Sequence, residues 1–167
     1  GTSDFRSLIV RLRGKKIDGL FVITQAEQTL AVIVRQIREQ SWTVPLYAIY
    51  WPSSPAFLSA LGLQADGIVY ADIPGNEVLT EEGRKVFDGF VSRYGLPKSS
   101  DYFFYLSYAA FAALHQALES GADLRDALAK GKFESVFGPF SFDENGDVVG
   151  LAHVLKVIKN GKPQLLK

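Results

Sequence analysis

The sequence contains no cysteine and no methionine, and its only histidines are His115 and His153. Without cysteine the chain can form neither a disulfide nor a thiolate metal site, and it has no cysteine nucleophile. Two histidines do not predict a histidine-rich metal site. Because a full-length chain starts with methionine, we expect this one to be a processed or truncated product, and no signal peptide is visible at its N-terminus.

The sequence also lacks an excess of charge of either sign, because 18 Lys and Arg residues are balanced by 18 Asp and Glu residues. A neutral chain has no general electrostatic attraction for nucleic acid or for an anionic membrane, so neither is expected as a partner. No apolar run approaches the roughly 20 residues of a membrane span. With 47% hydrophobic and 22% charged residues, the chain is expected to fold around a core.

Signatures of catalysis are missing as well. The sequence has no Walker loop, no Gly-x-Gly-x-x-Gly and no Gly-x-Ser-x-Gly motif. Neither histidine has a serine and a carboxylate nearby in sequence to suggest a catalytic triad, so both are interpreted as structural. We therefore predict no catalytic residue and no cofactor.

One acidic segment is spaced like a calcium-binding loop. Asp143, Asn145 and Asp147 alternate as in an EF-hand, but the twelfth position, which should be a glutamate, is Val154. Because Asn145 precedes a glycine and Asp and Asn favour turns, a hairpin turn is the preferred interpretation and no metal site is predicted.

The first 74 residues predict helices and strands in alternation. Amphipathic patterns indicate helices over 4–13, 26–40 and 55–61, with Ser3 or Asp4 and Ser54 as N-caps, and apolar runs indicate strands over 19–23, 45–50 and 67–71. The continuous run 19–23 is typical of a strand buried on both faces. Strands linked by short helical connections predict a parallel sheet.

The pattern changes after Pro74. Helices are predicted over 81–94, capped by Thr80, over 102–120 and over 124–130, followed by strands at 140–142 and 154–158 and a hairpin at Asn160-Gly161. Helix 102–120 is nearly apolar and is expected to be buried on most sides. Phe104 and Tyr105, within it, are expected to belong to the core.

Ligands of open α/β sheets bind beyond the carboxyl ends of the parallel strands. The loops at those ends supply aromatic, hydroxyl, amide and carboxylate groups suited to a small organic ligand, and the start of helix 102–120 could face the same crevice. The alternative is that Tyr50 and Trp51 pack as ordinary core. The candidate ligand-binding residues are Thr24, Gln25, Tyr50, Trp51, Ser53, Asp72, Tyr102 and Phe103.

Several segments, in order along the chain, resemble the type I periplasmic solute-binding proteins of ABC transporters, above all the branched-chain amino-acid (Leu/Ile/Val) binding family. They are Asp4-Phe5-Arg6-Ser7-Leu8-Ile9, Lys16-Ile17-Asp18, residues 34–38 and 65–69, Tyr94-Gly95 with Pro97, Ser107-Tyr108-Ala109-Ala110 and Gly138-Pro139-Phe140-Ser141-Phe142-Asp143-Glu144-Asn145-Gly146-Asp147. The resemblance covers the C-terminal half of such a protein.

That resemblance implies a Rossmann-like α/β fold with an incomplete two-lobe architecture. Residues 1–74 and the terminal strand pair 150–167 would belong to the second lobe, and residues 75–149 would return to the first. It further implies a non-catalytic protein of the periplasm or cell exterior, either free or lipid-anchored in the full-length parent. Such a protein closes its lobes around a small-molecule ligand and docks on a transporter permease.

The sequence departs from the family at the ligand. Where amino-acid binders of the family present an acidic residue, this chain has Tyr50-Trp51, and Thr24-Gln25 stands where they usually place an aromatic residue. The expected solute is a small organic molecule such as an amino acid, an amide or an aromatic or carboxylic acid. Because a buried ammonium without a carboxylate is costly, we favour a carboxylate, amide or aromatic acid stacked on Tyr50 or Trp51 over an ordinary α-amino acid, for which Glu27 or Asp72 would have to substitute for the missing acid.

Most of the first lobe implied by the resemblance is absent, so helix 102–120 is expected to expose an apolar face. We therefore expect the chain to self-associate or to bind a missing fragment. Two alternatives to a transport protein remain open. One is the ligand-binding sensor domain of a receptor or regulator with the same fold, and the other is a flavodoxin-like enzyme or nucleotide-binding domain, which the missing phosphate-binding glycines argue against.

Overall fold

The computed structural model describes residues 4–75, 78–95, 101–151 and 153–166, apart from the side chain of Tyr102. The chain forms two compact units. Unit 1 combines Gly1–Asp72 with Val154–Lys167, and unit 2 is the intervening segment Ile73–His153. The chain therefore leaves unit 1 after the third strand and returns to it for the last two.

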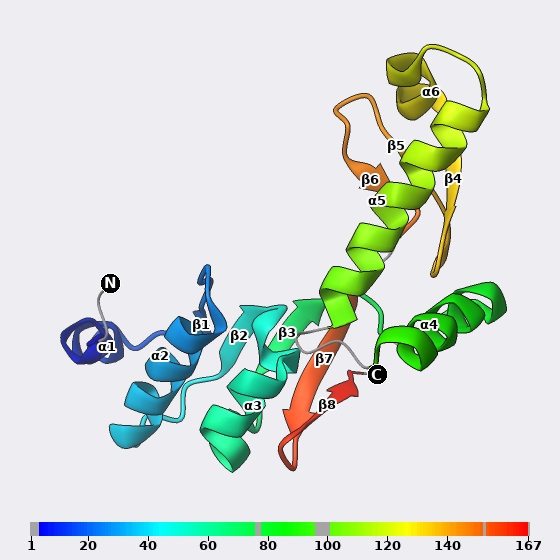
Figure 1. Ribbon diagram of the computed structural model, residues 1–167. Coiled ribbons are helices and arrows are strands. Elements are labelled where there is room, and N and C mark those ends of the chain that lie inside the picture. Colours follow the sequence, from blue (N-terminus) through cyan, green and yellow to red (C-terminus); the bar gives the residue numbers. More distant parts are fainter. Residues whose placement is uncertain (1–3, 76–77, 96–100, 152, 167) are drawn as a thin grey trace. The chain divides into compact units, whose positions relative to one another are not determined.

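Unit 1 is built on a mixed sheet with the strand order β1-β2-β3-β7-β8 (Figure 1). The first three strands are parallel, as predicted, whereas β7 and β8 each run antiparallel to the preceding strand of the sheet. The elements are α1 (Arg6–Arg13), β1 (Leu20–Phe21), α2 (Glu27–Glu39), β2 (Leu46–Ile49), η1 (Trp51–Ser53), α3 (Pro55–Leu61), η2 (Gly62–Ala65), β3 (Val69–Asp72), β7 (Val154–Lys159) and β8 (Lys162–Leu165).

The core of unit 1 lies on the face of the sheet that α2 and α3 cover (Figure 1). Helix α2 places apolar side chains at helical spacing, and the strands meet them with alternate residues. The largest contributions come from Leu30, Val34, Ile37, Phe57, Leu46, Ile68, Tyr70 and Ile158, all of which are buried. The other face of the strands is more open, since Tyr47 of β2 is 42% exposed.

The prediction that residues 19–23 form a strand buried on both faces is wrong. The strand is only Leu20–Phe21, and the side chains of Phe21 and Ile23 are 57% and 63% exposed. The reason is positional, because β1 pairs with β2 alone at the end of the sheet and the helices of the unit 1 core cover a single face.

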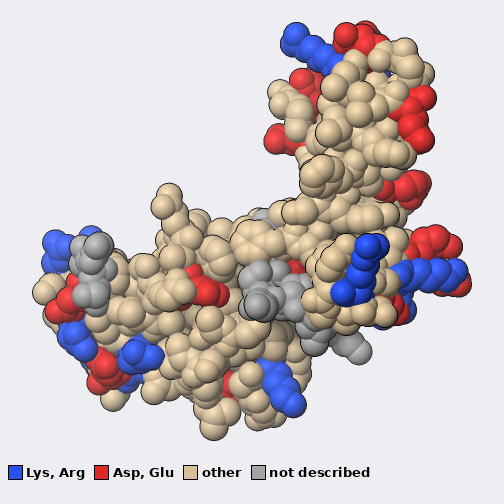
Figure 2. Space-filling view, in the orientation of Figure 1, with Lys and Arg blue, Asp and Glu red and all other residues tan. Residues whose placement is uncertain are grey.

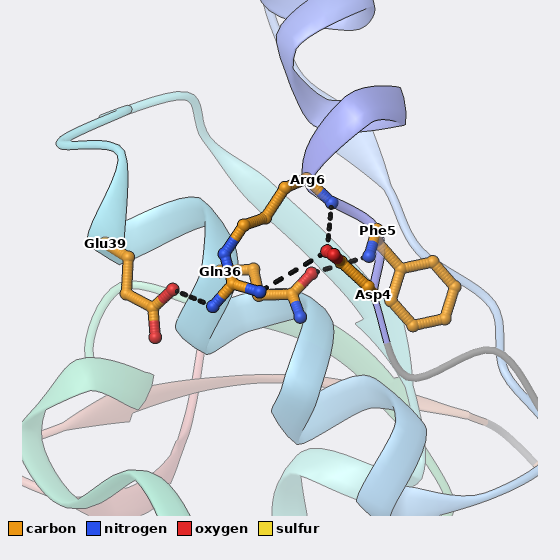
Figure 3. Close-up of polar contacts among 5 residues, drawn as sticks. All are labelled: Asp4, Phe5, Arg6, Gln36 and Glu39. Carbon is orange, nitrogen blue, oxygen red and sulfur yellow. Dashed lines mark hydrogen bonds and ion pairs between the residues drawn. The ribbon is translucent and has the colours of Figure 1, made fainter.

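Helix α1 is fastened to α2 by polar contacts at its N-terminal end (Figure 3). The backbone N–H of Phe5 donates to Oε1 of the buried Gln36 at 2.7 Å. The Arg6 guanidinium lies 2.7 Å from the carboxylate of Glu39 and 3.3 Å from that of Asp4. Hydrogen bonding to Glu39 is the largest cause of the raised pKa of Arg6. These contacts hold the exposed first turn of α1 on the protein.

The predicted hairpin at Asn160-Gly161 is confirmed and joins β7 to β8. Both residues have positive φ angles, 52° and 68°, as a two-residue hairpin turn of type I′ requires. The Asp66 carboxylate accepts their backbone N–H groups at 2.9 and 2.8 Å. A residue ahead of β3 thus fixes the turn at the other end of the chain.

Unit 2 consists of α4 (Glu81–Tyr94), α5 (Asp101–Glu119), α6 (Leu124–Lys130) and an antiparallel sheet of β4 (Lys132–Ser135), β5 (Gly138–Phe142) and β6 (Val148–Val149). Figure 1 shows this sheet beside the C-terminal half of α5. The sequence analysis found the helices and β5 but not β4 or β6. Both are short, and their apolar pattern is too brief to distinguish a strand from a loop.

Side-chain caps predicted from the sequence are present at two helices. The Ser54 hydroxyl accepts the backbone N–H of Phe57 at 3.1 Å at the start of α3, and the Thr80 hydroxyl accepts that of Gly83 at 2.9 Å at the start of α4. Each bond satisfies one of the backbone donors that a helix leaves unpaired at its N-terminus. For the first helix, Ser3 lies outside the described residues. The helix begins at Arg6 after Phe5, which makes no side-chain cap bond, while Asp4 accepts the backbone N–H of Arg6 at 3.0 Å.

Helix α5 is buried along one stripe. Tyr105, Ala109, Ala113 and Ala117 recur at every fourth position and are all buried. Near its N-terminus α5 joins an aromatic cluster in which Phe104 packs edge-on against Phe87 of α4 at 5.3 Å between ring centroids. Further along, the alanines allow the sheet to approach closely and pack against a second cluster that contains Phe133 and Phe140.

The opposite side of α5 is exposed, so the prediction that this helix is buried on most sides is wrong for this chain. Phe111 and Leu118 are 73% and 60% exposed, and Phe103, Leu106 and Leu114 are also exposed. The part of α5 visible in Figure 2 carries neither acidic nor basic side chains over most of its length. Phe104 and Tyr105 do belong to the core, as predicted.

Candidate functional site

The carboxyl ends of β1, β2 and β3 lie at the same end of the sheet because these strands are parallel. The loop after β1 contains Thr24 and Gln25. The Thr24 hydroxyl donates to the carbonyl of Ala26 at 2.9 Å, and Gln25 is exposed two residues before the start of α2. The loop after β2 is tied to this one, because the indole N–H of Trp51 donates to the carbonyl of Thr24 at 2.9 Å.

Trp51 contributes both to the core and to the site. Its ring packs at the margin of the unit 1 core while remaining only partly buried, and its N–H is used by the neighbouring loop. The two interpretations of this residue, core and ligand contact, are thus compatible. The ring fixes the spacing of the two loops and remains partly accessible.

Tyr50 has an unusual backbone conformation. Its φ and ψ angles are 50° and −58°, a combination that L-residues rarely adopt and that lies near a strained γ-turn. Its backbone N–H donates to the carbonyl of Ala71 on β3 at 2.9 Å, and its own carbonyl accepts from the backbone N–H of Ser53 at 3.1 Å. Strained residues of this kind cluster at ligand-binding sites, where the surrounding structure imposes the conformation.

Asp72, the last residue of β3, is 4% exposed, and its side chain contacts those of Ser53 and Lys156. Its Oδ2 atom accepts a hydrogen bond from the Ser53 hydroxyl at 2.5 Å and lies 3.3 Å from Nζ of Lys156, which is 9% exposed. The Ser53 hydroxyl also lies 2.8 Å from the hydroxyl of the buried Tyr70. We call Ser53, Tyr70, Asp72 and Lys156 the Asp72 cluster.

The hydrogen-bond directions within the Asp72 cluster follow from the donors available. Ser53 has a single hydroxyl hydrogen, and Asp72 receives it, so the Tyr70 hydroxyl donates to Ser53. Lys156 adds a charged donor to the same carboxylate oxygen. A buried ion pair is tolerated only when its charges are hydrogen-bonded in this way, and removing one partner would leave the other charge buried alone.

Sequence analysis selected Ser53 and Asp72 but missed Tyr70 and Lys156. Register explains their position, because Tyr70 pairs with Lys156 and lies two residues from Asp72 on β3, so all three side chains lie on one face. The available signal was a lysine at a central position of the otherwise apolar strand 154–158. A charge there indicates a buried partner.

The remaining site predictions lie in unit 2. Phe103, in the first turn of α5, is 49% exposed, and the side chain of Tyr102 lies outside the described residues. The structure brings together Thr24 with Trp51 and Ser53 with Asp72. Both of these pairs lie in unit 1.

The acidic loop after β5 forms the predicted turn. The Asp143 carboxylate accepts the backbone N–H groups of Asn145 and Asp147, both at 2.9 Å, and the bond from Asp147 is the largest cause of the lowered pKa of Asp143. His115 is exposed and lies 3.4 Å from Glu119. Among the described residues, no group of three or more His, Asp or Glu side chains could hold a metal ion, and no helix could cross a membrane.

Comparison with known proteins identifies the family. Residues 1–162 match the family described as periplasmic binding protein. The chain belongs to this family. The matched segment covers all of unit 2 and all of unit 1 except residues 163–167, so the resemblance found in the sequence is confirmed over nearly the whole chain.

Solved structures of related proteins share the fold. A leucine-binding protein LivK from Thermotoga maritima matches with a TM-score of 0.84 at 20% identity, over 100% of this chain and 49% of its own. LivJ from Streptococcus pneumoniae, a branched-chain amino acid transporter substrate-binding protein solved with isoleucine, matches with a TM-score of 0.78 at 22% identity over 99% of this chain and 49% of its own.

An extracellular ligand-binding receptor from Rhodopseudomonas palustris also matches, with a TM-score of 0.78 at 22% identity over 99% of this chain and 52% of its own. The chain thus spans about half the length of these solved relatives. The α/β, type I periplasmic-binding-protein fold is confirmed, and it is present here in part.

Proposed function

We propose that the chain is part of the solute-binding component of an ABC importer. It would act outside the cytoplasm, bind a small organic solute without catalysis and deliver it to a membrane permease. Membership of the periplasmic binding protein family carries this proposal. The mechanism would be closure of two lobes around the solute, after which the closed form docks on the transporter. In this proposal, residues 1–74 and 150–167 belong to one lobe and residues 75–149 to the other.

The candidate binding surface is the carboxyl end of the parallel strands of unit 1. The loops that follow β1 and β2 meet there through the Trp51–Thr24 hydrogen bond, and Gln25 and Tyr50 flank it. Aromatic rings give apolar contact, while hydroxyl and amide groups fix the orientation of a small ligand. Tyr102 and Phe103 remain proposed contacts from the second unit.

We further propose that the solute is a carboxylate, amide or aromatic acid rather than an ordinary α-amino acid. Asp72, one of two carboxylates considered as partners for an ammonium group, is buried and already bonded to Ser53 and Lys156. Glu27 is the other, and its carboxylate accepts from Gln28 at 3.2 Å. Burying an ammonium group without a carboxylate is unfavourable, which argues against amino acids unless Glu27 is the partner.

Thermal unfolding of the purified chain with benzoate, benzamide, L-leucine and L-isoleucine tests this proposal. A solute that binds only the folded state raises the unfolding temperature, so we expect benzoate or benzamide to do so and the two amino acids not to. Stabilisation by L-leucine that Glu27→Gln abolishes would show that the solute is an amino acid. Tyr50→Ala should remove the stabilisation by benzoate or benzamide. Tyr47→Ala, which changes an exposed tyrosine on the preceding strand, is the matched control.

The role of Trp51 can be separated into its ring and its N–H group. Trp51→Phe keeps an aromatic ring but loses the hydrogen bond to Thr24, whereas Trp51→Ala loses both. If the ring contacts the solute, the alanine variant should weaken benzoate or benzamide binding clearly more than the phenylalanine variant. Equal affinities for both variants and the original chain would contradict the assignment.

We also propose that the chain self-associates through the exposed side of α5. Phe111, Leu118 and their apolar neighbours form a stripe that carries no charge, and such surfaces are usually covered in soluble proteins. Native mass spectrometry should show dimers or larger assemblies for the original chain and mostly monomers for Phe111→Lys. A monomeric original chain would contradict the proposal, and any small molecule released on activation would reveal the solute class.

A second candidate is a ligand-binding sensor domain of the same fold. The similarity to a protein described as an extracellular ligand-binding receptor supports it. The other segments encoded by the full-length gene would distinguish the two functions. A leader peptide without a signalling module favours transport, and a membrane span followed by a signalling domain favours sensing.

A further inference from the structure

We propose that the Asp72 cluster is a positioning device for the turn after β2, and that Ser53, Asp72 and Lys156 hold Tyr50 and Trp51 in the geometry that the binding surface needs. The statement that this turn contacts solute rests on the proposed function. The positioning itself depends only on the contacts within unit 1.

The turn is held at both ends. At its start, the Trp51 indole donates to the carbonyl of Thr24, which belongs to the loop after β1. At its end, the Ser53 hydroxyl bonds to Asp72 and Tyr70, both on β3. Residues 51–53 therefore connect the loop after β1 with the central strand β3. The buried Pro52 lies between the two contacting residues.

The contact between Ser53 and Asp72 is supported by a residue that lies far away in the sequence. Lys156 on β7 lies opposite Tyr70 and contacts the same oxygen of Asp72 that Ser53 does. Because this carboxylate is almost fully buried, its orientation is fixed by its partners rather than by water. The final strands of the chain thus support a loop that lies more than a hundred residues earlier.

The strained backbone conformation of Tyr50 is the feature that the contacts of the Asp72 cluster would maintain. A tyrosine with φ of 50° and ψ of −58° would relax in a free loop, so the flanking contacts must hold it there. Its N–H is bonded to Ala71, the residue before Asp72, and its carbonyl to the N–H of Ser53. Loss of the Ser53–Asp72 bond should therefore release Tyr50 and Trp51 together.

The fluorescence of Trp51 tests the proposal without any solute. In a Trp42→Phe background Trp51 is the only tryptophan, and quenching by acrylamide reports how readily its ring is reached. We expect Ser53→Ala and Asp72→Ala each to raise the quenching constant about twofold, because the turn then opens locally. Effects of the two changes should not add, since both remove the same bond.

Two control variants separate positioning from general loosening. Ser59→Ala removes a hydroxyl from the exposed surface of α3, and Val34→Ala removes apolar volume from the core of unit 1 at a residue outside the Asp72 cluster. Neither should change the quenching of Trp51. The proposal is overturned if Ser53→Ala behaves like Ser59→Ala, or if Val34→Ala raises quenching as much as Ser53→Ala. A positive quenching result combined with no solute binding would sustain the positioning and reject the proposed function.

Discussion

The two units of this chain use their apolar and polar residues differently. Unit 1 packs mainly aliphatic side chains between two helices and one face of a sheet, and it buries an ion pair at the end of that sheet. Unit 2 packs aromatic rings and alanines along one stripe of a long helix, and its ion pairs lie on the surface. Each unit also exposes apolar surface, but unit 2 exposes much of it along one side of α5, whose acidic residues are Asp101 and Glu119 at its two ends.

This difference supports the proposal that unit 1 supplies the polar groups of the binding surface. A buried carboxylate and lysine cost free energy to desolvate and persist where they set a local geometry, as the Asp72 cluster does for the turn after β2. Aromatic packing of the kind seen around Phe87 stabilises without presenting polar groups. The described part of unit 2 is accordingly expected to supply mainly packing surface.

The largest expected effect separates the buried ion pair of unit 1 from a surface pair of unit 2. Lys156→Met leaves Asp72 charged and buried, which should lower the free energy of unfolding by roughly 3–5 kcal/mol. Lys130→Met, which removes the exposed partner of Asp126, should cost only about 0.5 kcal/mol. Urea denaturation measures both. The double change Asp72→Asn with Lys156→Met should recover much of the lost free energy of unfolding. Equal losses for Lys156→Met and Lys130→Met would contradict the difference between the buried and the exposed ion pair.

Next in size is a steric effect within unit 2. A Cβ atom at Gly83 would lie 2.2 Å from the backbone oxygen of Val136, whereas one at Gly89 of the same helix meets nothing within 4 Å. Gly83→Ala should therefore destabilise the protein by roughly 2–3 kcal/mol. Gly89→Ala should be neutral or stabilise it by up to about 1 kcal/mol. Thermal unfolding of both variants measures these effects. An unchanged unfolding temperature for Gly83→Ala would contradict the close approach of Gly83 to the backbone of Val136.

A smaller effect tests the strained residue of unit 1. At most positions a glycine variant of a protein is less stable than the alanine variant. At Tyr50, however, the positive φ angle favours glycine. Tyr50→Gly should therefore be more stable than Tyr50→Ala by about 1 kcal/mol, measured by chemical denaturation. The same pair at Tyr47, which lies on a regular strand, should show the opposite order.

The smallest effect concerns the turn of Asp143 in unit 2. Its pKa is lowered, so the folded state binds this proton less readily than the unfolded state does. The stabilisation is therefore present above the ordinary aspartate pKa and is lost as the pH falls through the lowered value. NMR titration of the carboxyl should place its midpoint below that ordinary value. In Asp143→Asn the corresponding part of the acid-induced loss of stability should disappear.

Local features of this fold could be predicted from the sequence, since they depend on neighbouring residues. The caps at Ser54 and Thr80, the hairpin at Asn160-Gly161 and the turn at Asp143 are all set by side chains and backbone preferences within a few positions. The parallel order of the first three strands also follows from their helical connections. The family resemblance was likewise visible in short segments along the chain.

Exposure and long-range pairing were decided only by the tertiary structure. An apolar run such as 19–23, or the helix that begins at Asp101, indicates that burial is favourable but not which face has a partner within the chain. The Asp72 cluster was hidden for a related reason. Lys156 is 84 residues from Asp72 in sequence, and only the register of β7 on β3 brings their charges together. The sequence by itself indicated the helices, most of the strands and the caps at Ser54 and Thr80, whereas the pairing of distant strands decided which polar side chains meet.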